Sequence, residues 1–149
     1  MNLIKKTYVK NWEHTKPEER HEITVTKGGK TCGIKTERIS EITEDIMYWR
    51  KANHIHHWFV DNVQGGEDNC QDYYVSREQL TELLALCHKV AKDHKLAPEL
   101  LPTQAGFFFG PTEYDDEYFK DIDNTIEVLE TLASEGGDDR GHFYYSSSW

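Results

Sequence analysis

Histidines, cations and aromatic residues gather in one run of the sequence, residues 48–64, which reads YWRKANHIHHWFVDNVQ. Imidazole rings ligate metals or move protons, and Lys and Arg bind phosphate and carboxylate groups. Aromatic rings can stack on a planar base. The run is therefore compatible with a metal centre, a catalytic centre or a ligand-binding wall.

A metal centre receives little support from the spacing of these histidines. On a helix His54 and His57 share a face, but the residue four positions after His54 is Trp58, which cannot ligate. His57 and Asp61 are four apart and could chelate together. A zinc site needs three or four convergent ligands, and no recognisable spacing supplies the others. We therefore predict neither a metal nor a cofactor.

Catalytic motifs are equally weak. The sequence contains no P-loop, no GxGxxG fingerprint and no nucleophile on a recognisable elbow. Histidines and carboxylates are nevertheless the usual acid–base groups of enzymes. A small hydrolase that uses His54 or His57 is therefore kept as the third interpretation, behind two that need no catalysis.

The pattern of charge and rings favours a ligand-binding wall. If the run is helical, one stripe contains Tyr48, Lys51, His54 and Trp58, and Arg50 lies on the next stripe. Burying a charge without a partner is costly, so these cations are expected to face a ligand rather than the core. Two other aromatic residues of the run, Trp49 and Phe59, are expected in the core.

A second aromatic cluster follows in the loop LLPTQAGFFFGP, residues 100–111, where glycines allow the backbone to approach a ligand closely. We predict that the cations and His54 contact anionic groups, that aromatic rings line the pocket, and that loop residues bind polar edges. The predicted site comprises Tyr48, Arg50, Lys51, His54, Trp58, Thr103, Gln104 and Phe109.

Hydrophobic periodicity predicts the elements that would position these residues. Short strands are expected over residues 7–12 and 21–27, followed by a tight KGGK turn and a return strand over residues 31–37. A long helix is expected over residues 37–63, because apolar residues recur there at spacings of three and four.

The second half of the chain predicts one further strand, two helices and a closing strand or extended tail over residues 142–149. The strand covers residues 72–76, and the capping box of Ser76 and Gln79 opens a helix that fades near residue 92. Another helix is capped by Thr112 or Asp115 and runs to about residue 134. The order predicts a single compact α+β domain over residues 1–149, with three main helices packed on a small antiparallel sheet.

The composition of the chain limits the classes of partner and the cellular location that we expect. The net charge is -10, and residues 65–149 hold 18 acidic and six basic side chains, which disfavours general nucleic-acid binding. No apolar run of about 18 residues occurs, and no apolar signal segment opens the chain, so we predict no membrane span and a cytoplasmic location. The three cysteines have no CxxC spacing and are predicted to be free thiols.

Acidic residues recur at helical spacing along the last predicted helix. Such a stripe could imitate a phosphate backbone and block a host protein, although charge runs of this kind are usually ordinary solvated faces. The stripe contains Glu113, Asp116, Asp123, Glu127 and Glu130.

Several long segments resemble a family of small proteins encoded by bacteriophages and prophages. They include YWRKANHIHHWFVDNVQ, LLPTQAGFFFG and FYYSSSW, and the resemblance covers nearly the whole chain. It implies a phage accessory protein in the host cytoplasm and supplies no catalytic residues. We therefore predict a homo-oligomeric, non-catalytic binder that sequesters a small anionic or nucleotide-type ligand and counters host defence. The alternative is an inhibitor that binds a host defence or nucleic-acid-processing protein.

Overall fold

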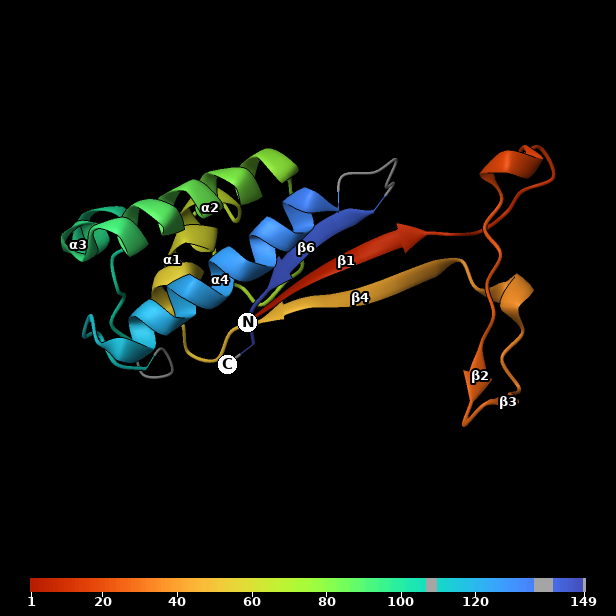
Figure 1. Cartoon of the computed structure of the whole chain (residues 1–149), viewed down its shortest axis with the longest axis horizontal. Coiled ribbons are helices and arrows are strands. Elements are labelled where there is room, and N and C mark those ends of the chain that lie inside the picture. Colours follow the sequence, from red (N-terminus) through yellow and green to blue (C-terminus); the bar gives the residue numbers. More distant parts are fainter. Residues whose placement is uncertain (107–109, 136–140, 149) are drawn as a thin grey trace.

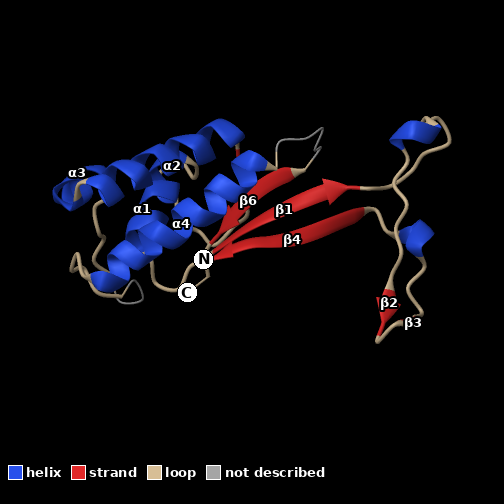
Figure 2. Ribbon diagram, in the orientation of Figure 1, coloured by secondary structure: helices blue, strands red, loops and turns tan. Residues whose placement is uncertain are grey.

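The computed structural model describes residues 1–106, 110–135 and 141–148. Within these residues the chain is α+β, as the sequence predicts. An antiparallel sheet has the strand order β4-β1-β6-β5, and helices pack against it (Figures 1 and 2). The sheet strands are β1 Asn2–Tyr8, β4 Glu41–Tyr48, β5 Tyr73–Val75 and β6 His142–Ser146, and the α-helices are α1 Asn53–Asn62, α2 Arg77–Lys92, α3 Ala97–Leu100 and α4 Asp116–Ser134.

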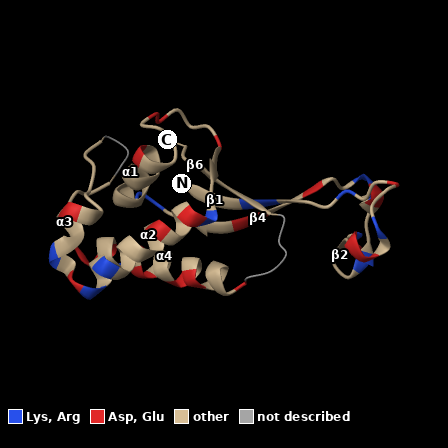
Figure 3. Cartoon of the chain, turned by 90° about the horizontal axis from the view of Figure 1, so that it is seen from above, with Lys and Arg blue, Asp and Glu red and all other residues tan. Residues whose placement is uncertain are grey.

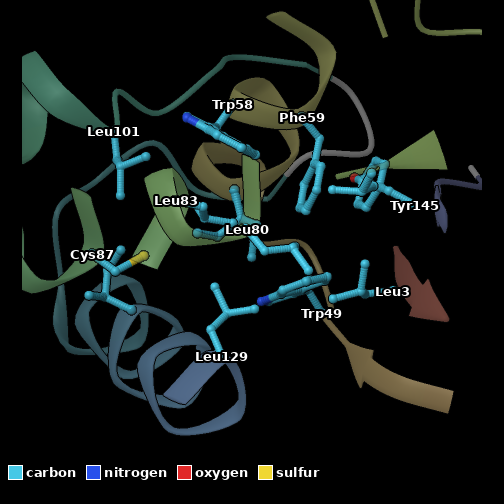
Figure 4. Packing of buried hydrophobic residues seen from close by; sticks show 14 of the residues in the cluster. Leu3, Trp49, Trp58, Phe59, Leu80, Leu83, Cys87, Leu101, Leu129 and Tyr145 are labelled. Atoms are coloured by element: carbon cyan, nitrogen blue, oxygen red, sulfur yellow. The ribbon is translucent and has the colours of Figure 1, made fainter. Parts of the chain in front are cut away.

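The core joins one face of the sheet to α1, α2 and α4 (Figure 4). Phe59 of α1 stacks on Tyr145 of β6, with ring centroids 3.9 Å apart and planes only 7° from parallel. Trp49, which follows β4, is buried beside both rings, and its Nε1 donates a hydrogen bond of 2.9 Å to Thr125 Oγ1 of α4. One aromatic cluster therefore fastens two helices to the sheet.

The predicted helix boundaries in the second half are confirmed. The Ser76 hydroxyl accepts from the Gln79 amide, and the Gln79 side chain accepts from the Ser76 amide, which completes the capping box of α2. Asp115, rather than Thr112, caps α4 by accepting from the Tyr118 amide. Among the described residues, no helix has both the length and the apolar composition that crossing a membrane requires.

The predicted helix over residues 37–63 is wrong. Residues 41–48 form β4, which pairs with β1 from end to end except at Ile46, where a register shift leaves no Cα partner, and only residues 53–62 are helical. Lys51 has φ of 61°, a left-handed conformation that interrupts any continuous right-handed helix. The β-branched residues Ile42, Thr43 and Ile46 fit a pleated strand, and pairing with β1 decided between the two periodicities.

The predicted strands at the start of the chain are partly wrong. β1 covers residues 2–8 instead of the predicted 7–12. Residues 21–25 and 32–37, which were predicted to belong to strands, are not in a strand. The KGGK turn is confirmed: β2 Thr26–Lys27 pairs with β3 Lys30–Thr31 across Gly28 and Gly29, which have φ of 58° and 75°. Both central residues of this hairpin turn need positive φ, which glycine adopts without strain.

Residues 9–40 form an arm that projects from the end of the β1–β4 ribbon, away from the helices (Figures 1 and 3). It contains β2, β3 and two short 3-10 helices, η1 Pro17–Glu19 and η2 Thr36–Arg38. Val9, at its base, is the one hydrophobic side chain of the arm that is buried among the described residues. The arm therefore adds almost nothing to the core of its own chain.

A partly buried chain of polar groups connects the segment after α1 to the sheet. His56 Nδ1 lies 2.7 Å from the Tyr145 hydroxyl, and His56 Nε2 lies 3.3 Å from a carboxylate oxygen of Asp68. The other Asp68 oxygen accepts from the Ser147 hydroxyl at 3.3 Å. Because the carboxylate only accepts, Nε2 carries the proton and Nδ1 accepts from Tyr145. The histidine at the centre of the HIHH run thus has a structural role.

Replacing Tyr145 with Phe should keep the ring stack on Phe59 and remove the hydroxyl that His56 Nδ1 bonds. Losing one partner of a buried hydrogen bond costs about 1–3 kcal/mol. Urea denaturation of Tyr145→Phe should show a loss of unfolding free energy in this range. Tyr144→Phe, on the neighbouring residue of β6, is the matched control and should change stability by less; equal losses would contradict the assignment.

Candidate functional site

A cavity of about 290 Å³ opens between the turn after β4, the start of α1 and the first turns of α4. We call it the α1–α4 cavity. Four residues of the predicted site, Arg50, Lys51, His54 and Thr103, line it. The complete lining is Arg50, Lys51, Asn53, His54, Thr103, Pro111, Glu113, Asp115, Glu117, Tyr118 and Asp121.

The cations reach the cavity because the chain turns sharply between β4 and α1. Lys51 adopts the left-handed conformation and packs against Gly110, whose φ is 83°. A Cβ on Gly110 would lie 3.1 Å from the Cβ of Lys51, which is tighter than ordinary van der Waals contact. Glycine at position 110 therefore meets two requirements, positive φ and close approach to Lys51.

Asn53, at the first position of α1, connects the cavity to the loop between α3 and α4. Its Nδ2 donates to the Pro111 carbonyl at 2.8 Å, and its Oδ1 accepts from the Gln104 amide at 3.0 Å. The Thr103 hydroxyl donates to the Thr112 carbonyl at 2.9 Å. One buried amide side chain thus holds both limbs of the loop, which sets the position of the cavity wall.

The facing wall is the amino-terminal part of α4. Asp115 caps the helix, and Glu117 and Asp121 follow along its first turns. Tyr118 is buried and donates its hydroxyl hydrogen to the Leu101 carbonyl at 2.8 Å, and burial raises the pKa of this phenol. Tyr118 therefore stays protonated and acts as a fixed wall of the cavity.

Two helix amino-termini meet at the cavity, and they differ in charge. The amino-terminus of α4 is occupied by the carboxylate cap of Asp115 and by two acidic residues of its first turn. The amino-terminus of α1 has no side-chain cap and no acidic residue in its first turn. Its first amide groups lack intrahelical partners and carry partial positive charge. An anion is thus favoured at the α1 end.

Charged side chains of both signs line the cavity without forming ion pairs with one another in the described part of the chain. Within the described part of the chain, neither Arg50 nor Lys51 forms an ion pair with a carboxylate. Both side chains are exposed, and four acidic residues line the same space: Glu113, Asp115, Glu117 and Asp121.

His54 is a buried neutral group in this cavity. It is 3% exposed, its ring centroid lies 4.0 Å from that of Tyr118, and its Nε2 has no hydrogen-bond partner in the structure. Burial lowers the pKa of His54 to about 3. His54 therefore carries no charge at neutral pH and offers a hydrogen bond rather than a cation, unlike Arg50 and Lys51.

The pKa of Asp121 is shifted in the opposite direction, upward. Burial, and then the negative charge of Glu117, raise the pKa of this carboxyl group to about 6; Asp115 adds to the rise, and Lys120 opposes it. A carboxyl group in a cavity with its pKa close to neutral is a feature of many functional sites. Nothing in the spacing of the sequence pointed to Asp121.

The remaining predicted residues lie elsewhere. Tyr48 is 66% exposed at the end of β4, and Trp58 is 6% exposed in the core. Neither residue lines the cavity, nor does Gln104, whose amide bonds Asn53. Phe109 lies outside the described residues. The predicted helical stripe through Tyr48 and Lys51 is wrong, because neither residue is in a helix.

Sequence reasoning missed seven lining residues. Asp115 was singled out as a helix cap and Glu113 as part of the acidic stripe, but none of the seven was assigned to the site. The start of α1 was hidden by the incorrect long helix, and long-range proximity of α4 has no local signal. The missed residues are Asn53, Pro111, Glu113, Asp115, Glu117, Tyr118 and Asp121.

The other histidines of the run are directed away from a common centre. His56 joins the Tyr145–Asp68 chain, and His57 Nε2 lies 3.2 Å from an Asp61 carboxylate oxygen on the same helix. His57 and Asp61 are thus in contact, as their spacing suggested. Across the described ranges, no group of three or more His, Cys, Asp or Glu side chains is placed to hold a metal ion.

Comparison of the chain with protein-family models, with curated proteins and with solved structures finds no match. The resemblance to phage proteins stays a prediction from sequence motifs. Function is therefore inferred from the geometry and charge of the α1–α4 cavity.

The shifted pKa values of His54 and Asp121 should change the free energy of unfolding in opposite directions as the pH falls. The pKa of His54 is about 3 in the folded chain against 6.5 in the unfolded chain, so the unfolded chain binds more protons between these values. His54 therefore lowers stability as pH falls below 6.5, by at most about 1.4 kcal/mol per pH unit. The pKa of Asp121 is about 6 against 3.8, so Asp121 adds stability as pH falls through that window.

Urea denaturation between pH 7 and pH 4 measures both effects. Relative to the wild type, His54→Gln should lose less stability on acidification, and Asp121→Asn should lose more. The background from other groups, including His56, whose pKa burial also lowers, is common to all three proteins. Parallel pH profiles for the three proteins would contradict the assigned pKa directions.

Proposed function

We propose that the protein is a non-catalytic binder that sequesters a small anionic, nucleotide-type ligand in the α1–α4 cavity. One observation carries the proposal: the cavity combines an uncapped helix amino-terminus, a set of carboxylates and two cations that form no ion pair within the described residues. A ligand that satisfies both sets of groups would bind more tightly than water or a simple ion.

The anionic end of the ligand would lie against Arg50, Lys51 and the start of α1. Arg and Lys donate charge-assisted hydrogen bonds to phosphate or carboxylate oxygens. The amino-terminal end of α1, which has no side-chain cap, adds a dipole that favours an anion. His54 Nε2, which has no hydrogen-bond partner among the described residues, supplies one further polar contact at the same end.

The other end of the ligand would face the acidic wall of α4. Carboxylates only accept hydrogen bonds, so they match the amino and ring N–H donors of a nucleobase. A purely anionic ligand would be repelled by this wall, since like charges at close range disfavour binding. Of the small anionic and nucleotide-type ligands expected from the sequence, the acidic wall therefore favours one that has an anionic group and a donor edge.

The volume of the cavity limits the size of the ligand. At about 290 Å³ it lies at the lower end of the range of small-molecule pockets, which is about 300–1,000 Å³. This space suits a mononucleotide better than an oligonucleotide. Sequestration of such a ligand agrees with the phage counter-defence setting that the motif resemblance implies, and that setting stays a prediction.

A small hydrolase is the second candidate, and the raised pKa of Asp121 favours it. A carboxyl group near its pKa at neutral pH can act as general acid or base. His54 is ill suited to that role, because its low pKa keeps it neutral. If Asp121→Asn abolishes turnover of a bound nucleotide while binding persists, the protein is an enzyme and the sequestration proposal is wrong.

Replacing Arg50 and Lys51 with Ala should abolish ligand binding and leave the fold intact, because both side chains are exposed. A hydrogen bond to a charged group contributes about 1.5–3 kcal/mol, so each cation is worth roughly 10- to 100-fold in affinity. Native mass spectrometry of the freshly purified protein identifies any ligand carried through purification. Calorimetric titration with nucleoside monophosphates then measures affinity for wild type and variant.

Lys89→Ala with Lys92→Ala is the matched control, since it removes two exposed cations from the far end of α2. It should bind as the wild type does. Unfolding of the Arg50–Lys51 variant, judged by circular dichroism, would show that these cations are structural. Retained affinity in a folded variant would exclude the α1–α4 cavity as the binding site.

A further inference from the structure

The arm, residues 9–40, has too little buried surface to order itself. Fixing a residue costs about 1–2 kcal/mol of backbone entropy, and burial of apolar side chains normally offsets this cost. Within the arm one hydrophobic side chain is buried, and Trp12 and Ile34 are 49% and 55% exposed. An ordered arm therefore needs a surface outside its own fold.

The outer part of the arm is apolar and basic. Residues 23–36 contain three lysines and no acidic residue. All three lysines are exposed, as is the side chain of Ile34 in the same segment. We call this segment, with Lys27, Lys30, Ile34 and Lys35, the arm tip. Its complement is an apolar groove with an acidic rim.

The body of the same protein carries such a groove. It has a volume of about 220 Å³ and lies between β4 and the carboxyl-terminal half of α4. Its apolar lining is Ile46, Val128 and Leu132, and its rim carries two exposed glutamates, Glu127 and Glu135. β4 is an edge strand of the sheet, so the groove borders an edge that is open in the described structure.

The arm tip does not reach the groove of its own chain. Figure 1 places the arm at the opposite end of the β1–β4 ribbon from the helices. A strand advances about 3.4 Å per residue, and Ile46 of the groove follows Glu41 by five residues, so the base of the arm lies about 17 Å along β4 from the groove. An arm tip that docks in this groove would therefore belong to another copy of the chain.

We propose that the protein forms a reciprocal dimer in which the arm tip of each copy docks in the β4–α4 groove of the other. Charge complementarity selects a second copy: residues 9–40 carry seven basic and five acidic side chains, whereas the whole chain has a net charge of -10. A twofold axis satisfies both arms and both grooves at once.

A charge exchange tests the proposal in the full-length protein. One variant reverses the tip (Lys27→Glu, Lys30→Glu, Lys35→Glu), and the other reverses the rim (Glu127→Lys, Glu135→Lys). Sedimentation equilibrium should show a wild-type dimer and, for each variant alone, a dimer dissociation constant raised by about 100-fold or more, because like charges then face each other. An equimolar mixture of the two variants should dimerise again, since every tip then meets a rim of opposite charge.

The matched controls are Lys89→Glu, Lys92→Glu and Lys95→Glu together, and Glu82→Lys with Glu99→Lys, all on exposed positions away from the groove. They should remain dimeric, and circular dichroism should show every variant folded. A monomeric wild type, a dimer that survives both reversals, or folded variants that fail to reassociate when mixed would overturn the proposal. Nucleic acid that binds monomeric protein through the tip lysines would also overturn it and reassign the arm.

Discussion

The turn from β4 into α1 is the constraint on which the candidate site depends. Trp49 is held in the core by its ring contacts and by its hydrogen bond to Thr125. Lys51 then adopts positive φ, and the chain enters α1. Because Trp49 is fixed on one side and Asn53 on the other, the two cations between them have little choice of position. The rigid core thereby orients exposed charge toward α4.

The content of the second half of the chain could be predicted from its sequence, because the signals there are local. Capping side chains at Ser76 and Asp115 sit where hydrophobic periodicity begins, and the structure places α2 and α4 at these positions. In the first half, Ile42 and Ile46 lie on one face of either a helix or a strand. Pairing with β1 decides that these residues form a strand. Because β1 and β4 are far apart in the sequence, no local pattern predicts this pairing.

The candidate site could be predicted only in part, because some of its residues have local sequence signals and others are brought in by long-range packing. Arg50, Lys51 and His54 stood out by residue type within one short run, and Thr103 by its place in a glycine- and proline-framed loop. The acidic wall contributed by α4 depends on tertiary packing, and its presence changes the chemistry of the site. An apparently cationic wall proved to be one side of a cavity with mixed charge. Burial also converted His54 from an expected cation into a neutral group.

The position of β1 in the sheet has a consequence for how the chain folds. β1 is an inner strand, paired on one side with β4 and on the other with β6, so that Leu3 lies beside Tyr145. These two residues belong to nearly opposite ends of the chain. Closing so long a loop costs entropy before its contacts are gained, and folds rich in such contacts form slowly. During synthesis, the sheet and the aromatic core against it can be completed only after the last strand has left the ribosome.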